Sequence, residues 1–448
     1  MVAPPAAVLP LAEGRFQAMK DVFTSYLAQG FALLGNFVGG VIAARLLLPV
    51  GRGELGQVML WPMLFSSLGA FAIGDAIIYF AAGHRVALSR VMASAFAIGT
   101  ALSVILMIGG YVALPYVLAD ASPDMLRISD FYLIYIPLGY ASFYVICAFQ
   151  AIHRFMLWNG LRALLSWAYA ALAILFWLTR DYSVAAFAAA SLLANFAVLV
   201  AGAAALQRMN ALGFRSDLNL AKGMLGYGAR IHLSNLLALA SQRLDQILIT
   251  LWLPPAEFGF YLVAMSVHLS TTGLVTLLGS LLFPKVAAAE DDKARAEAMG
   301  PYLRLALILS LGGGLLLLVL APWLMVWIYG AAYEPTVLSV QVFAVGTAPT
   351  AGKALLSQAF KAIGQPRSII LAEGAALAAN AIALVVLIPV CGILGAAIAF
   401  VLAQALGFAV LAAALRRQLG MAILPLFTPS RRDVSFVAQQ LKNVIGAP

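Results

Sequence analysis

Several ionisable side chains lie inside stretches of sequence that are otherwise apolar. Arg243 and Asp245 fall within one such stretch, and Asp75, Lys353 and Glu373 fall within three others. A charged group at the depth of a lipid bilayer costs about 2.5–3.5 kcal/mol on insertion scales, so it needs a partner or a hydrated cavity. These groups are therefore candidates for binding a charged substrate or for coupling transport to an ion.

Arg243 and Asp245 are two residues apart, about 200° around a helix, and cannot pair with each other. One face of this helix carries His232, Asn235, Gln242, Arg243 and Gln246, and the other carries Ser234, Ser241 and Asp245. A helix with two polar faces should line a hydrated cavity on one side and pack against protein on the other. We interpret Arg243 as a cavity cation for an anionic substrate, and the other substrate-binding candidates on its face are Asn235, Gln242 and Gln246. The alternative is a structural pair between Arg243 and a carboxylate of a neighbouring helix.

Lys353 is the second candidate for a cavity cation, because it lies about two turns inside the end of its apolar run. Lys361 follows two turns later on the same face. Because it lies near the end of the run, its long side chain can place its charge in water. Asp75, Asp245 and Glu373 are candidates for binding a coupling proton or cation. For Glu373 the alternative is a structural ion pair with Lys361.

The composition identifies the surroundings of these groups as a membrane. The chain has 448 residues, of which 63% are hydrophobic and 10% charged, whereas soluble domains carry about 25% charged residues. We expect an all-α polytopic membrane protein, and the composition excludes a disulfide scaffold and a soluble nucleic-acid reader. Apolar runs long enough to span a bilayer recur twelve times, near 22–44, 57–82, 91–118, 131–152, 161–178, 184–206, 229–252, 258–284, 302–328, 338–361, 368–389 and 393–415.

The distribution of Lys and Arg predicts the orientation of these spans. Of the 27 Lys and Arg residues, 21 fall on the side that holds both termini, four fall on the opposite side, and Arg243 and Lys353 lie within spans. Cytoplasmic loops of membrane proteins carry an excess of positive charge. Both termini are therefore predicted to be cytoplasmic, and the net charge of +9 reflects topology.

An internal repeat divides the spans into six and six. The first span ends in Leu46-Leu47-Leu48-Pro49 followed by Glu54-Leu55-Gly56, and the seventh ends in Leu251-Trp252-Leu253-Pro254 followed by Glu257-Phe258-Gly259. Two halves of the same orientation are typical of alternating-access transporters, although a generic helical turn with proline would give a similar pattern. The predicted organisation is an N-terminal segment (1–20), an N-lobe (21–206), a linker (207–228), a C-lobe (229–415) and a basic tail (416–448), the last either an interfacial helix or a solvated segment.

Catalytic motifs are missing from the sequence. It contains no P-loop, no Gly-x-Ser-x-Gly elbow and no His/Cys cluster. We therefore expect no ATP hydrolysis by the chain itself, no catalytic residues, no metal and no cofactor.

The order of several short motifs resembles a known family over about residues 20–415. The motifs are Ala44-Arg45-Leu46-Leu47-Leu48-Pro49, Gly51-Arg52-Gly53-Glu54-Leu55-Gly56, Tyr227-Gly228, Arg243-Leu244-Asp245, Leu253-Pro254, Glu257-Phe258-Gly259, Tyr261, Phe283-Pro284-Lys285-Val286, Ile328-Tyr329-Gly330, Gly364-Gln365-Pro366-Arg367 and Gly392-Ile393-Leu394-Gly395-Ala396-Ala397. The chain resembles the oligosaccharide flippases of bacterial polysaccharide synthesis, in the MATE-like multidrug/oligosaccharidyl-lipid/polysaccharide exporter superfamily.

This resemblance implies two six-helix lobes around a central cationic cavity in the bacterial inner membrane. A polyprenyl-pyrophosphate-linked oligosaccharide would cross from the cytoplasmic to the periplasmic leaflet by alternating access, for O-antigen, capsule or exopolysaccharide synthesis. The implied partners are this lipid-linked substrate, membrane lipids, a polysaccharide polymerase and a chain-length regulator, and no nucleic acid. Relatives couple transport to protons, to sodium or to the membrane potential.

Three alternatives to this function stay open at the level of sequence. A lipid II flippase is a close relative, and a MATE-type cation-coupled drug exporter should have a carboxylate-rich cavity, whereas here Arg243 and Lys353 lie deep. A membrane-embedded polysaccharide ligase or polymerase would need a sizeable outer loop. The longest predicted outer connection, 119–130, is too short for one.

Overall fold

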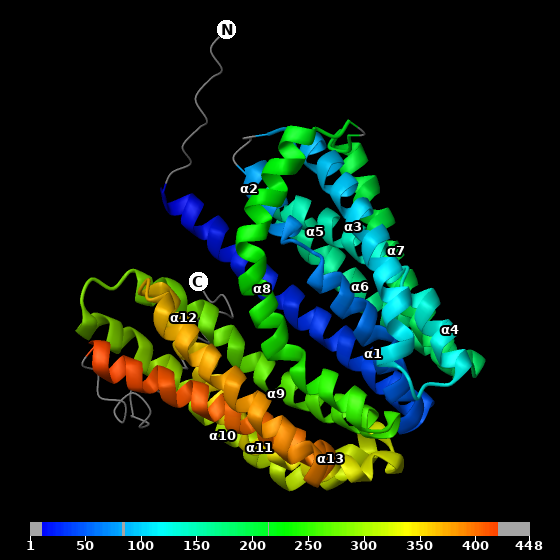
Figure 1. The fold of residues 1–448 in the computed structure, drawn as a ribbon. Coiled ribbons are helices and arrows are strands. Elements are labelled where there is room, and N and C mark those ends of the chain that lie inside the picture. Colours follow the sequence, from blue (N-terminus) through cyan, green and yellow to red (C-terminus); the bar gives the residue numbers. More distant parts are fainter. Residues whose placement is uncertain (1–10, 83–85, 214, 420–448) are drawn as a thin grey trace. The chain divides into compact units, whose positions relative to one another are not determined.

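The computed structural model describes residues 11–82, 86–213 and 215–419, and in these residues it contains helices and no strands (Figure 1). The all-α fold class is confirmed. The elements are α1 (Leu11–Leu68), α2 (Ile73–Ala81), α3 (Leu88–Val117), α4 (Pro123–Tyr132), α5 (Tyr135–Ala151), α6 (Phe155–Thr179), α7 (Val184–Arg208), α8 (Leu218–Trp252), α9 (Pro255–Ala287), α10 (Asp292–Leu324), η2 (Met325–Tyr329), η3 (Ala331–Thr336), α11 (Val337–Val345), α12 (Thr347–Ala362) and α13 (Pro366–Leu419). The basic tail beyond residue 419 and the first ten residues lie outside the described part of the chain.

The twelve predicted spans lie largely on helical segments, but the chain divides them differently from the sequence prediction. α1 continues from the first span into the second across a kink at Leu48, where φ is 57°. α13 joins the last two spans across a kink at Gly392, where φ is 58°. Pro49 follows Leu48, and proline disfavours helical backbone at the residue before it.

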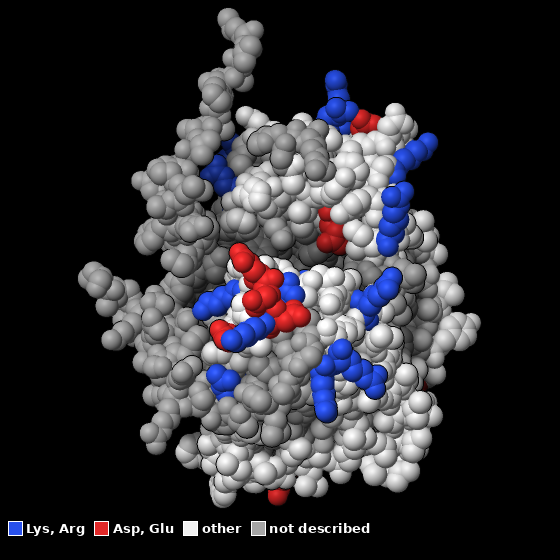
Figure 2. All heavy atoms as spheres, turned by 90° about the vertical axis from the view of Figure 1, so that its left-hand side faces the viewer, with Lys and Arg blue, Asp and Glu red and all other residues white. Residues whose placement is uncertain are grey.

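Seven helical segments of the described chain are long and apolar enough, by length and composition, to cross a bilayer. They are Ala28–Leu68, Leu88–Val117, Pro123–Ala151, Phe155–Thr179, Val184–Arg208, Asp292–Tyr329 and Pro366–Gln418. Large apolar side chains are mostly exposed on several of these segments, among them Tyr116, Met156 and Trp327. Figure 2 shows one face of the molecule, on which the described Lys, Arg, Asp and Glu side chains lie in small groups and part of the described surface carries none. Exposed apolar surface of this extent is the surface that a bilayer covers.

The chain forms two compact units. The first comprises Met1–Leu46 and Val58–Leu236, and the second comprises Leu47–Gln57 and Leu237–Pro448. α8 passes from one unit to the other at Leu236, and α1 contributes to both. The chain therefore changes unit inside two continuous helices.

In the first unit α5 is the central helix, since α2, α3, α6 and α7 all pack against it. Tyr144 and Phe149 of α5 are buried there, together with Phe187 of α7. In the second unit α12 packs against α9, α10 and α13. Its core consists of Val275, Leu282, Val286, Met299, Tyr302, Leu303, Ala306, Ala351, Leu355, Leu356, Ala359, Phe360, Ala372, Leu411, Ala412 and Leu415.

The two turns that suggested an internal repeat lie against each other within the second unit. A Cβ atom at Gly53 would overlap the carbonyl oxygen of Pro255, and a Cβ atom at Gly259 would overlap the carbonyl oxygen of Pro49. Glycine at both positions therefore allows the two backbones to approach this closely. This contact explains why Leu47–Gln57 belongs to the second unit although the first span does not.

The predicted span 57–82 is interrupted in the first unit. α1 ends at Leu68, and α2 begins at Ile73 after Phe71 and Ala72 adopt left-handed backbone, with φ of 42° and 47°. Left-handed backbone costs about 1–2 kcal/mol per non-glycine residue, so the surrounding structure must hold this break in place. The periodicity of the sequence did not predict the break, because the apolar run is continuous through it.

Candidate functional site

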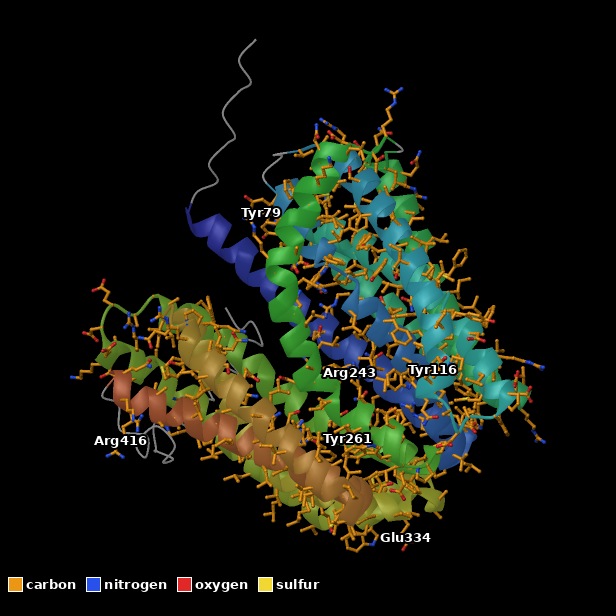
Figure 3. All side chains as sticks on the ribbon, in the orientation of Figure 1. Tyr79, Tyr116, Arg243, Tyr261, Glu334 and Arg416 are labelled. Carbon is orange, nitrogen blue, oxygen red and sulfur yellow. The ribbon has the colours of Figure 1, made fainter. Side chains whose placement is uncertain are left out.

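The polar residues of α8 that were predicted to face a cavity differ in their exposure. Arg243 is half-buried, and its Nη1 donates a hydrogen bond to Oε1 of Gln246 at 2.9 Å. Gln246 itself is buried, whereas Gln242 and Asn235 are exposed. Figure 3 labels Arg243 on α8. The Arg243 guanidinium is therefore oriented by the side chain of Gln246, about one turn further along α8.

Asp245 has a different environment from Arg243. Its side chain is 3% exposed and accepts hydrogen bonds from the backbone N–H of Gln246, at 2.8 Å, and from the hydroxyl of Tyr261. Tyr261 lies on α9 and is completely buried (Figure 3). Asp245 is therefore held in the contact between α8 and α9 by two uncharged donors.

Lys353 and Glu373 form an ion pair between α12 and α13, with 2.8 Å between Nζ and Oε2. The Lys353 side chain is nearly buried, and its methylene stem lies against Gly407, where a Cβ atom would approach Lys353 Cδ to 3.0 Å. Lys361, which the sequence offered as the partner of Glu373, is exposed. Lys361 and Glu373 were predicted to lie at a similar depth. In the structure, however, Lys353 is the lysine that faces Glu373 between α12 and α13.

α8 also holds the break between α1 and α2 within the first unit. Nε2 of His232 lies 2.8 Å from the carbonyl oxygen of Leu68, and the His232 ring stacks on Phe71 with 5.1 Å between centroids. A Cβ atom at Gly228 would overlap the carbonyl oxygen of Phe71. Broken helices inside membrane proteins are tolerated where neighbours satisfy the freed backbone groups, and here α8 supplies those neighbours.

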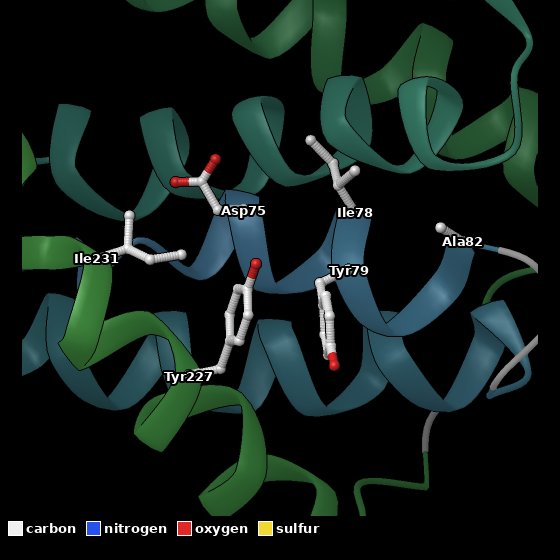
Figure 4. Close-up of a pocket in the computed structure, with 6 residues that line it drawn as sticks. All are labelled: Asp75, Ile78, Tyr79, Ala82, Tyr227 and Ile231. Atoms are coloured by element: carbon white, nitrogen blue, oxygen red, sulfur yellow. The ribbon is translucent and has the colours of Figure 1, made fainter. Parts of the chain in front are cut away.

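A cavity of about 340 Å³ lies beside this break, between α2 and α8 (Figure 4). Its lining residues are Asp75, Ile78, Tyr79, Ala82, Tyr227 and Ile231. Asp75 is exposed, and among the described residues no hydrogen-bond or ion-pair partner lies against its carboxylate. The described part of the chain contains no group of three His, Cys, Asp or Glu side chains that could hold a metal ion.

A family profile and the fold place this arrangement among known proteins. Residues 42–338, more than half of the chain, match the profile of the family described as polysaccharide biosynthesis protein. The chain belongs to this family of polysaccharide biosynthesis proteins. No curated protein sequence matches the chain.

Solved membrane transporters share the fold of this polysaccharide biosynthesis protein. The inward closed conformation of the lipid II flippase MurJ aligns with a TM-score of 0.75 over 94% of this chain and 96% of that chain, at 13% identity. An inward-facing multidrug resistance MATE family transporter aligns with a TM-score of 0.65 over 89% and 94%, at 14% identity. The eukaryotic MATE transporter AtDTX14 aligns with a TM-score of 0.60 over 95% and 100%, at 13% identity. The fold is therefore MATE-like, as the resemblance implied.

The structure of this family member brings together two aromatic residues that sequence reasoning did not assign to a site, although Tyr227 stood in one of the family motifs. The rings of Tyr79 and Tyr227 stack in the wall of the cavity with 4.3 Å between their centroids. Tyr79 follows Asp75 by four residues, so a helical reading would have placed both on one face. Tyr227 could not have been found in this way, because it is distant in sequence.

Proposed function

We propose that the protein flips polyprenyl-pyrophosphate-linked oligosaccharide units from the cytoplasmic to the periplasmic leaflet of the bacterial inner membrane by alternating access. Membership of a polysaccharide biosynthesis family and a transporter fold support this function together. The observation that carries it is Arg243, a half-buried cation on α8. A cation at this position gives a transporter a group that can bind an anionic substrate.

Arg243 is the proposed contact for the pyrophosphate of the substrate. The planar guanidinium group matches the oxygens of a phosphate with two parallel donors. The hydrogen bond to Gln246 fixes the direction of the guanidinium, which lowers the entropy lost on binding. Gln242 and Asn235 are exposed on the same helix and are proposed as additional polar contacts.

Lys353 and the three acidic residues are proposed to act in coupling. Glu373 neutralises Lys353 in the present conformation. If a proton or cation bound to Glu373, Lys353 would lose this partner and could bind an anion. Asp75 and Asp245 remain further candidates for the coupling ion. Protons, sodium and the membrane potential are the driving forces that this scheme admits.

The proposed topology follows the positive charge of the loops. With 21 of 27 Lys and Arg residues on one side, both termini are proposed to be cytoplasmic. A flippase of this orientation would deliver its product to a periplasmic polymerase and chain-length regulator.

The proposal is tested by the substitution Arg243→Ala in a strain whose surface polysaccharide depends on this gene. We expect export to fall about 10- to 100-fold, because a hydrogen bond to a charged group contributes about 1.5–3 kcal/mol. Arg243→Lys should retain part of the activity, and Arg416→Ala, at an exposed position near the end of α13, should retain all of it. Membrane abundance of each variant is measured in parallel.

Normal polysaccharide export by Arg243→Ala at equal abundance would refute the role of Arg243. A lipid II flippase would instead rescue cells depleted of their own lipid II flippase. Rescue of that strain, without an effect on surface polysaccharide, would replace the proposed substrate. Family membership favours the polysaccharide precursor.

A further inference from the structure

The cavity between α2 and α8 of the first unit has the size and the mixed lining of a binding site for a small polar ring. Its volume of about 340 Å³ falls within the range of roughly 300–1,000 Å³ that is typical of ligand pockets. Its walls combine one carboxylate, two phenol rings and the apolar side chains of Ile78, Ala82 and Ile231. A ligand that fits these walls has both hydroxyl groups and an apolar face.

Three aromatic rings pack together at the aromatic wall of the cavity. Tyr79 and Tyr227 stack with an interplanar angle of 18°, and Phe80 meets both rings edge to face, with centroids 5.2 Å and 6.1 Å away. Tyr79 nevertheless remains 43% exposed. A fixed aromatic surface attracts the weakly positive C–H groups of a neighbouring ring, because the face of an aromatic ring is electron-rich.

Asp75 supplies the polar side of the cavity. An ionised carboxylate accepts hydrogen bonds through both oxygens and donates none, so it selects ligands that carry several donors. In Figure 4 the Tyr227 ring extends from α8 towards α2 at Asp75, and the Asp75 carboxylate points away from the ring; both residues line the cavity. Two adjacent hydroxyl groups of a sugar ring would satisfy the two oxygens while the sugar covers the outer face of one tyrosine.

A metal ion fits the same walls less well. Sites for calcium-like hard cations usually provide six to eight oxygen ligands, whereas this cavity is lined by one carboxylate, two phenols and three hydrocarbon side chains. The apolar share of the lining favours a ligand with carbon surface. An organic ammonium ion also carries carbon surface, so binding of such a cation is the alternative result of the experiment.

The cavity is held in shape by contacts that do not need a ligand. Gly228 and His232 of α8 hold the break at Leu68 and Phe71, and Tyr227 and Ile231 lie directly beside them on the same helix. The break in turn fixes the start of α2, which carries Asp75 and Tyr79. Such preorganisation lowers the entropy cost of binding.

We infer that Asp75, Tyr79 and Tyr227 form a subsite for one pyranose ring of the transported saccharide. Asp75 accepts hydrogen bonds from ring hydroxyls, and the outer face of the stacked tyrosine pair packs against the C–H face of the sugar. This inference rests on the proposed function for its biological meaning, but the site itself can be tested with a free sugar.

The first experiment uses saturation-transfer NMR of N-acetylglucosamine with the full-length protein in detergent. We expect transfer from the protein to the ring protons of the sugar, and loss of this transfer in Tyr79→Ala/Tyr227→Ala. The variant Tyr79→Phe/Tyr227→Phe keeps both rings and should keep the signal, as should Tyr116→Ala, which removes an exposed ring elsewhere in the first unit. Asp75→Ala should weaken the signal more than Asp75→Asn, because the amide keeps one acceptor.

The second experiment separates the subsite from the proposed function. Binding of undecaprenyl pyrophosphate, with and without one N-acetylglucosamine, is measured in nanodiscs. Loss of one aromatic contact of about 0.5–1.5 kcal/mol corresponds to roughly 2- to 12-fold in affinity. Tyr79→Ala/Tyr227→Ala should therefore weaken the sugar-bearing lipid by about this factor and leave the bare lipid unchanged, whereas Arg243→Ala should weaken both.

Several results would overturn the inference. Absence of a signal from N-acetylglucosamine with the wild-type protein refutes the sugar subsite, whatever the lipids do. A signal from choline in its place identifies a cation site. Failure of both lipids to bind, with the sugar signal intact, refutes the proposed substrate while leaving the subsite standing.

Discussion

Lys353 and Glu373 neutralise each other between α12 and α13, with 2.8 Å between Nζ and Oε2. Lys353 is the deeper of the two lysines predicted on this face, and in this conformation its charge is neutralised by a carboxylate. Arg243 donates a hydrogen bond to the uncharged amide of Gln246.

Removal of one member of the Lys353–Glu373 pair should destabilise the protein. Lys353→Ala leaves a carboxylate that is 43% exposed, so we expect a loss of about 1–3 kcal/mol, below the 3–5 kcal/mol of a fully buried pair. Thermal unfolding of the purified variants gives the measurement. The exchange Lys353→Glu/Glu373→Lys should recover part of the loss, and strictly additive effects of the two single exchanges would show that the pair does not contribute.

Tyr261→Phe should destabilise the second unit, because it removes a hydroxyl donor from the buried carboxylate of Asp245. An unsatisfied buried polar group costs about 1–3 kcal/mol, and more when it is charged. Tyr144→Phe is the matched control, since the buried Tyr144 hydroxyl has no hydrogen-bond partner among the described residues. Equal melting temperatures of the two variants would contradict the role of the Tyr261 hydroxyl.

Gly228→Ala should disturb the break between α1 and α2, since the added methyl group would overlap the carbonyl oxygen of Phe71. We expect a loss of about 1–3 kcal/mol from overpacking and weaker binding of N-acetylglucosamine. At Gly226 a Cβ atom meets nothing within 4 Å, so Gly226→Ala should be neutral or stabilising by up to about 1 kcal/mol. A neutral Gly228→Ala would show that the close approach is not needed.

Gly259→Ala should separate the two repeated turns, because its methyl group would overlap the carbonyl oxygen of Pro49. Unfolding temperature and limited proteolysis report the loss. Gly374→Ala on α13 of the same unit is the control, since a Cβ atom there meets nothing within 4 Å. Similar behaviour of both variants would argue against a tight contact between the turns.

The ionisation of the Asp217 carboxyl should make the stability of the folded protein depend on pH. Hydrogen bonds from the backbone N–H of Leu220 and from Arg90 lower the pKa of the Asp217 carboxyl. A lowered pKa in the folded state contributes stability above the ordinary carboxyl pKa, and this contribution is lost as the pH falls through the folded pKa. The difference in melting temperature between the wild type and Asp217→Asn should therefore be largest near neutral pH and shrink below about pH 4. A difference that does not change with pH would contradict this assignment.

The sequence by itself determined the helical class, the positions of the apolar runs and the asymmetry of the loop charges. These properties follow from a local rule, because the bilayer demands about 20 apolar residues for each helix wherever it lies. The same rule could not reveal the break at Leu68, since left-handed backbone at Phe71 and Ala72 depends on Gly228 and His232 far along the chain.

Only the tertiary structure decided the neighbours of the ionisable residues. Asp245 meets Tyr261, Glu373 meets Lys353 in place of Lys361, and Asp75 shares a cavity with Tyr227. Each of these contacts joins two helices, and its formation depends on how the helices are rotated about their axes and how their side chains interlock. The position of a residue within an apolar run indicates its depth in the membrane, but it contains no information on which neighbour the residue faces.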